Sequence, residues 1–143
     1  MKKTHVRVGD LISYQETIEN TFHWNVGVIR WLKTIPDSKL ELGMMTLANS
    51  AVPVAVKALK GPGYGTDYFR GLLIPKQVSV NQTRSILVPS KVYDIHSELA
   101  VNMKNKLFYI RLDGLLRATN EFNQFTFEVM NHKPIDPNHF LNV

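Results

Sequence analysis

Apolar residues alternate with polar or small residues in five stretches of the chain. The stretches cover residues 24–28, 40–44, 52–56, 99–103 and 125–129. A period of two places one face of a strand on a core and the other toward solvent. Helical spacing is weak: residues 15–20 could form one turn, and residues 111–121 could form a short helix or continue a strand. The dominant element is therefore expected to be the β-strand.

Turn-forming residues separate these stretches. Pro36-Asp37 predicts a tight turn, Lys104-Asn105 predicts the centre of a hairpin, and the glycine-rich residues 60–67 form the clearest loop. The fold class is therefore predicted to be all-β. We expect a small antiparallel β-barrel with about eight short strands and at most one or two short helices. Residues 1–130 are assigned to a single barrel domain and residues 131–143 to an irregular C-terminal tail.

Composition places the chain among soluble globular domains. It has 143 residues, of which 44% are hydrophobic and 20% charged, enough for one core. No apolar stretch approaches the roughly 20 residues of a membrane helix, and the basic N-terminus lacks the apolar region of a signal peptide. The absence of cysteine excludes a disulfide framework, thiolate zinc sites and a cysteine nucleophile. We expect a cytoplasmic protein that does not contact membranes.

No constellation of catalytic residues stands out. The chain lacks a Gly-x-Ser-x-Gly elbow, and no pair of carboxylates suggests a general acid and base. His132, Asp136 and His139 have metal-binding side chains, but their spacing across two prolines matches no ligand pattern. We therefore predict a protein that is not an enzyme and has no catalytic residue, metal site or cofactor. An enzyme with residues assembled across a barrel mouth is the least favoured alternative.

The glycine-rich loop and the residues after it offer candidate binding groups. Tyr64, Tyr68 and Arg70 place aromatic rings and a guanidinium near a loop, where a planar ligand could stack. A plain hairpin loop is the competing interpretation, because the segment lacks the ending of a phosphate-binding loop. These three residues are predicted to be ligand-binding.

A second group of candidates lies near the two tryptophans. Trp24 and Trp31 are seven residues apart, so a regular strand would place them on opposite faces, one in the core and one exposed. Arg30, Trp31 and Arg84 complete the set of predicted ligand-binding residues. The alternative for Trp31 is a structural role in capping a barrel end.

The segments Val26-Gly27-Val28-Ile29-Arg30-Trp31 and Leu42-Gly43-Met44 resemble paired strands of PilZ-type β-barrels (split barrels). The resemblance extends over residues 6–130. PilZ domains bind the bacterial messenger cyclic di-GMP through an Arg-x-x-x-Arg segment and an Asp/Asn-x-Ser-x-x-Gly motif. Neither motif is present: Arg7 is followed by Leu11, and in Asp94-Ile95-His96-Ser97 the serine comes one position late. No ligand residue is therefore carried over from the family.

The resemblance implies a non-catalytic regulatory or interaction domain of a bacterial protein. Its partner would be another protein or another domain, with cyclic di-GMP as a further candidate ligand. The net charge of +5 also leaves open a nucleic-acid-binding small barrel of the SH3-like or OB-like kind. Binding of that kind should weaken steeply with salt.

Overall fold

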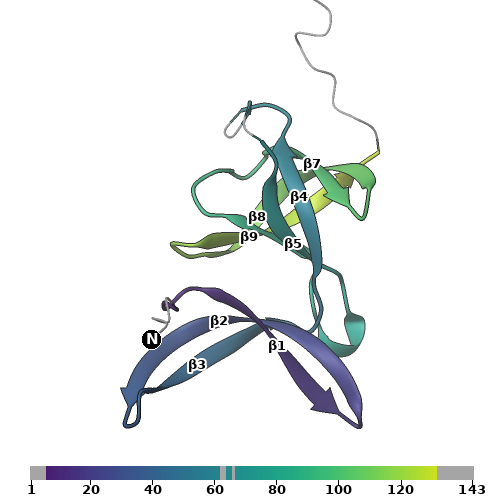
Figure 1. The fold of residues 1–143 in the computed structure, drawn as a ribbon. Helices are drawn as coiled ribbons and strands as arrows, with labels where there is room; N and C mark the ends of the chain where they lie inside the picture. The colour runs from purple at the N-terminus through teal and green to yellow at the C-terminus, as the bar shows by residue number, and fades with distance from the viewer. Residues whose placement is uncertain (1–5, 62–63, 66, 132–143) are drawn as a thin grey trace, which may run out of the picture. The chain divides into compact units, whose positions relative to one another are not determined.

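The computed structural model describes residues 6–61, 64–65 and 67–131, with the side chains of His23 and Val80 excepted. These residues form nine strands and one short 3₁₀-helix (Figure 1). In chain order the elements are β1 (Leu11–Ile18), β2 (Thr21–Ile35), β3 (Lys39–Ala48), β4 (Val52–Ala58), β5 (Phe69–Ile74), η1 (Val78–Val80), β6 (Ser85–Pro89), β7 (Glu98–Met103), β8 (Lys106–Ala118) and β9 (Phe122–Met130). The all-β fold class with a small antiparallel barrel is confirmed.

The chain divides into two compact units, residues 1–51 and residues 52–143. The first holds the three-stranded antiparallel sheet β1-β2-β3, and the second holds a closed barrel. The single barrel expected over residues 1–130 therefore begins only at Val52, because β1 to β3 pair among themselves and form a sheet of their own. The expected irregular tail lies outside the described residues from position 132 onward.

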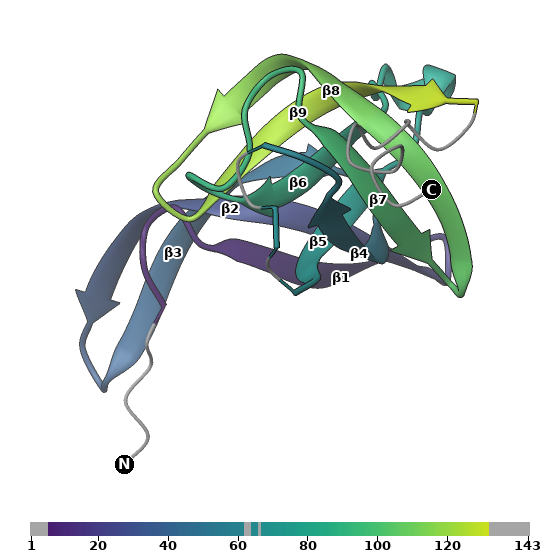
Figure 2. The same ribbon diagram turned by 90° about the horizontal axis from the view of Figure 1, so that it is seen from above.

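Six strands close the barrel in the order β4-β5-β6-β9-β8-β7, and β7 pairs back with β4. Every pairing is antiparallel. The long strands β8 and β9 lie side by side (Figure 2). Lys104 and Asn105 join β7 to β8 with φ angles of 50° and 65°, the left-handed geometry of a two-residue hairpin turn. The predicted turn is confirmed.

Alternating apolar residues fill the barrel interior. On β4, Val54, Val56 and Ala58 are buried, in line with the expected period of two. The buried cluster contains Val54, Val56, Ala58, Leu73, Ile86, Val88, Tyr93, Leu99, Val101, Ile110, Leu112, Phe125 and Phe127. A closed barrel leaves no open sheet edge, so the backbone hydrogen bonds of these strands are satisfied within the unit.

Tyr93 is the polar exception in this core. Its ring meets that of Phe69 edge to face, with the centroids 6.2 Å apart and the planes at 88°. Only 2% of the residue is exposed, and its hydroxyl has no hydrogen-bond partner among the described residues. Burial disfavours the phenolate and raises the pKa of Tyr93 from 10.0 to about 12.

The segments for which a helix was considered are strands. Residues 15–18 belong to β1, and Glu19 and Asn20 form a left-handed hairpin turn to β2. Residues 111–118 belong to β8, where irregular pairing with β9 on both sides of Leu115 disturbs the period of two. The loosely helical spacing of leucines there reflects these irregularities, because pairing with β9 fixes the backbone as a strand.

Candidate ligand-binding sites

An irregularity in β2 determines where its aromatic residues point. Ile29 pairs with Met44 on β3, but Trp31 pairs with Gly43, so Arg30 is one extra residue on β2. This is the pairing of a β-bulge, which reverses the alternation of side chains beyond it. Arg30 is exposed and forms no ion pair within the described residues.

The bulge brings both tryptophans to one face of the sheet. Trp24 and Val28 share a face, because β2 pairs regularly with β1 between them. Val28 pairs with Met45 and Trp31 pairs with Gly43. Met45 and Gly43 are two residues apart on β3 and share a face, so Trp31 lies on the face of Trp24.

The prediction that one tryptophan is buried and the other exposed is wrong. Trp24 and Trp31 are 61% and 47% exposed, and Phe22, on the same face, is 67% exposed. We call Phe22, Trp24 and Trp31 the aromatic face. Trp31 packs over Gly43, where a Cβ atom would collide with the indole ring. The absence of a side chain at Gly43 thus leaves room for the indole.

Other stretches of the sheet also depart from simple alternation. Asn25 was expected on a solvent-facing side but is only 2% exposed. Its amide donates a hydrogen bond of 2.9 Å to a carboxylate oxygen of Glu16 on β1, which satisfies a buried polar group. On β3, Leu40 and Met44 are exposed although the pattern predicted a core face.

In the barrel unit, Tyr68 and Arg70 lie where β4 and β5 pair. The Lys57 ammonium stands over the Tyr68 ring at 5.6 Å from its centroid, a cation–π contact. Arg70 on β5 is exposed and pairs with Ala55 on β4. Tyr64 is also exposed, and its backbone N–H donates to the Gly61 carbonyl at 3.0 Å. Part of the predicted loop, residues 62, 63 and 66, lies outside the described residues.

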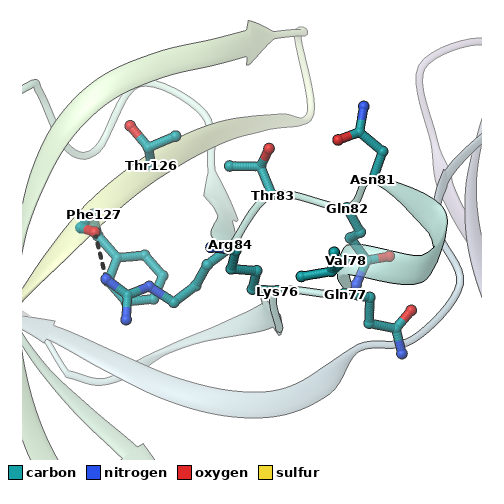
Figure 3. Close-up of a pocket in the computed structure, with 9 residues that line it drawn as sticks. All are labelled: Lys76, Gln77, Val78, Asn81, Gln82, Thr83, Arg84, Thr126 and Phe127. Carbon is teal, nitrogen blue, oxygen red and sulfur yellow. Dashed lines mark hydrogen bonds between the residues drawn. The ribbon is translucent and has the colours of Figure 1, made fainter.

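Arg84 lines a separate cavity of about 700 Å³ at the connection between β5 and β6 (Figure 3). Its guanidinium lies over the Phe127 ring at 4.7 Å from the centroid and donates a hydrogen bond of 3.2 Å to the Phe127 carbonyl. The lining residues are Lys76, Gln77, Val78, Asn81, Gln82, Thr83, Arg84, Thr126 and Phe127. The side chains are mostly polar, and none of these described residues is acidic.

The structure thus places the six predicted residues apart from one another. Arg30 and Trp31 are neighbours on β2, and Arg84 belongs to the cavity. Tyr68 contacts Lys57, Arg70 lies on β5, and Tyr64 is exposed in the loop before β5. Sequence reasoning missed Phe22 and Trp24 as parts of an exposed face, since the bulge at Arg30 leaves no signal in the pattern. It also missed the rest of the cavity, whose members come from two segments more than 40 residues apart.

Other functional features are scarce among the described residues. They contain no group of three or more metal-ligating side chains. They also contain no helix long and apolar enough to cross a membrane. The histidines of the C-terminal segment that were weighed as metal ligands, His132 and His139, lie outside the described residues.

The described residues thus form an all-β protein with a three-stranded antiparallel sheet and a closed six-stranded barrel. Residues 54–130 match the family model described as "FimW C-terminal beta-barrel domain", and residues 2–53 match "Cyclic-di-GMP receptor FimW, middle PilZ domain". The barrel match alone covers more than half of the chain, so the chain belongs to this FimW family. The expected PilZ-like character is confirmed.

One curated relative is the cyclic-di-GMP receptor FimW of Pseudomonas aeruginosa. It is 20% identical over 122 residues, which cover 85% of this chain and 20% of the relative. The chain thus spans about a fifth of the length of this relative. No solved structure shows a significant match to the chain.

Proposed function

We propose that this chain is a non-catalytic, cytoplasmic regulatory segment of a cyclic di-GMP receptor. One observation carries the proposal: two neighbouring modules of the same receptor family match the chain one after the other, over residues 2–53 and 54–130. The boundary between the matches falls within two residues of the boundary between the two structural units. A sheet and a barrel whose described residues show no recognisable catalytic constellation are suited to binding and relaying a signal.

Arg30 and Trp31 are the proposed contacts for cyclic di-GMP on the sheet. The ligand offers guanine bases that stack on flat side chains and phosphates that pair with guanidinium groups. Trp31 presents its exposed indole over Gly43, and Arg30 extends from the bulge next to it. Because the Arg-x-x-x-Arg and Asp/Asn-x-Ser-x-x-Gly motifs are missing, these two side chains replace part of the usual contacts, and micromolar affinity is expected.

Calorimetric titration with cyclic di-GMP at low and moderate salt tests this assignment. Arg30→Gln should weaken binding about tenfold or more, since a charge-assisted hydrogen bond contributes about 1.5–3 kcal/mol. Lys33→Gln is the matched control, because Lys33 is an exposed cation three residues further along β2. Equal losses in the two variants would show that only net charge matters and would reject the assignment.

A single-stranded oligonucleotide in the same calorimeter separates this proposal from the nucleic-acid alternative. Cyclic di-GMP should bind with a modest salt dependence, because it carries only two phosphates. Tight oligonucleotide binding that falls steeply with salt, without cyclic di-GMP binding, would favour a nucleic-acid module.

The aromatic face supports a second function, binding of a protein partner. Phe22 and Trp24 are more than half exposed, and large aromatic side chains are enriched at the centres of interfaces. A photo-crosslinking amino acid placed at Phe22 in cells should give a discrete crosslinked product that Trp24→Ala abolishes. The same probe at Lys104, on the β7–β8 turn, is the control. Identical products at both positions would rule out a partner at this face.

A further inference from the structure

The barrel unit contains a concave site that the proposed function does not use. The cavity between the β5–β6 connection and β9 has a volume of about 700 Å³, within the range of small-molecule pockets. Two of its lining residues, Lys76 and Arg84, are cationic, and none of the described lining residues is acidic. Neither cation forms an ion pair among the described residues. The lining residues therefore carry positive charge that no ion pair neutralises, and the carboxylate of Asp113 accepts a hydrogen bond from the Thr126 hydroxyl.

Arg84 is held in place before any ligand arrives. Its guanidinium rests against the Phe127 ring and donates one hydrogen bond to the Phe127 carbonyl (Figure 3). A guanidinium has five N–H donors, so this single bond leaves most of these donors available to a ligand. Fixing the group in advance lowers the entropy lost when it binds a ligand. Arg84 is exposed, so the remaining donors can be reached from solvent.

The connection between β5 and β6, which supplies the other wall of the cavity, is also held in place by hydrogen bonds. Gln77 and Gln82 exchange two backbone hydrogen bonds of 2.9 and 2.8 Å across the base of the loop. The Gln82 amide donates a further bond of 2.6 Å to the Pro75 carbonyl. Asn81 closes the 3₁₀ turn in the left-handed region with φ of 53°, and its N–H donates to the Val78 carbonyl at 3.1 Å. Lys76 and Thr83 thus flank a closed hairpin.

The chemistry of the lining indicates the class of ligand. A fixed guanidinium fork and an ammonium together match a doubly charged phosphoryl group. The hydroxyl group of Thr83 and the amide of Asn81 can donate to further oxygens, whereas the Thr126 hydroxyl already donates to the Asp113 carboxylate. We propose that this cavity binds the phosphoryl group of a small phosphorylated molecule through Arg84 and Lys76. The site belongs to the barrel alone and does not depend on ligand binding by the sheet.

Two sources share this chemistry, a phosphate monoester and the phosphodiester of cyclic di-GMP. We would titrate the isotope-labelled 143-residue chain with GMP, guanosine, inorganic phosphate and cyclic di-GMP, and follow backbone amide signals by NMR. GMP and phosphate should shift the signals of Gln77, Thr83 and Phe127, and guanosine should not. Competition between cyclic di-GMP and GMP for these signals would identify the messenger as the source, and its absence would identify a monoester.

Substitutions show whether the two cations hold the ligand. Lys76→Gln should weaken GMP binding about fivefold, and Arg84→Gln about tenfold or more, because the fork makes the stronger contact. Arg84→Lys should restore part of the loss. Lys104→Gln is the matched control, since it removes one exposed cation from the same barrel on the β7–β8 turn.

Lys76 makes no hydrogen bond, ion pair or ring contact among the described residues, so Lys76→Gln still tests the proposal if Arg84→Gln disturbs the fold. Absence of phosphate-dependent shifts, or equal affinity of the Lys76→Gln and Lys104→Gln chains, would overturn the proposal. Binding of cyclic di-GMP by the sheet is followed separately, through the NMR signals of β2 and the effect of Arg30→Gln. Failure of that binding can therefore be told apart from failure of the cavity to bind a phosphoryl group.

Discussion

Replacing Tyr93 by phenylalanine removes a buried hydroxyl from the barrel core. The ring and its edge-to-face contact with Phe69 are retained, so no cavity forms. The hydroxyl is buried without a hydrogen-bond partner among the described residues. An unpaired polar group of this kind costs about 1–3 kcal/mol. Tyr93→Phe should therefore raise the free energy of unfolding at pH 8 by an amount in that range.

The pH dependence of the free energy of unfolding gives a second, independent prediction for Tyr93. The pKa of Tyr93 is raised to about 12 in the folded protein, against 10.0 for an ordinary tyrosine. The folded state therefore keeps the Tyr93 hydroxyl proton up to a higher pH than the unfolded state does. The stability that follows from this difference is fully present below pH 10 and is lost as the pH rises toward 12. Between pH 9 and pH 11 the loss amounts to about 1 kcal/mol.

Urea unfolding followed by far-ultraviolet circular dichroism measures both effects. The parent chain and the Tyr93→Phe variant share every other ionisable group, so the informative quantity is the difference in stability between the two. That difference should grow by about 1 kcal/mol from pH 9 to pH 11. A variant less stable than the parent at pH 8 would show that the hydroxyl is hydrogen-bonded. A difference that does not change with pH would refute the raised pKa.

Three further substitutions test other parts of the structure. Gly43→Ala should displace the Trp31 indole, shift its indole N–H signal in NMR spectra and weaken cyclic di-GMP binding; an unchanged signal would contradict the packing of Trp31 on Gly43. Leu112→Ala should lower the free energy of unfolding by about 3 kcal/mol in urea titrations, because Leu112 is fully buried in the barrel; a loss below about 1 kcal/mol would place Leu112 outside the core. Arg111→Ala should leave the Tm unchanged in calorimetry, although Arg111 pairs with Glu128 at 2.9 Å, since both side chains are exposed; a large drop would show that this pair is structural.

Local patterns were sufficient to predict much of the barrel. The alternation at Val54 and Val56 and the turn at Lys104-Asn105 depend on neighbouring residues, and both occur as expected. Regular period-two spacing is informative wherever a strand has one buried face. The PilZ-like resemblance likewise depended on short runs such as residues 26–31, which lie within β2.

The features that were missed depend on pairing between distant segments. The division at Val52 arises because β3 pairs with β2 and β4 pairs with β5 and β7, a choice that no local pattern reveals. The extra residue at Arg30 is visible only against the register of β3. In the same way, the contact of Arg84 with Phe127 spans 43 residues. A single sequence contains no signal for such contacts.

We propose that the sheet unit binds cyclic di-GMP through Trp31. The chain has two tryptophans, both on β2, so its NMR spectrum contains two indole N–H signals that report on this unit. Titration with cyclic di-GMP should shift the Trp31 signal in a saturable way, with a midpoint in the micromolar range that Arg30→Gln moves upward. A Trp31 signal that stays in place at high ligand concentration would contradict the claim.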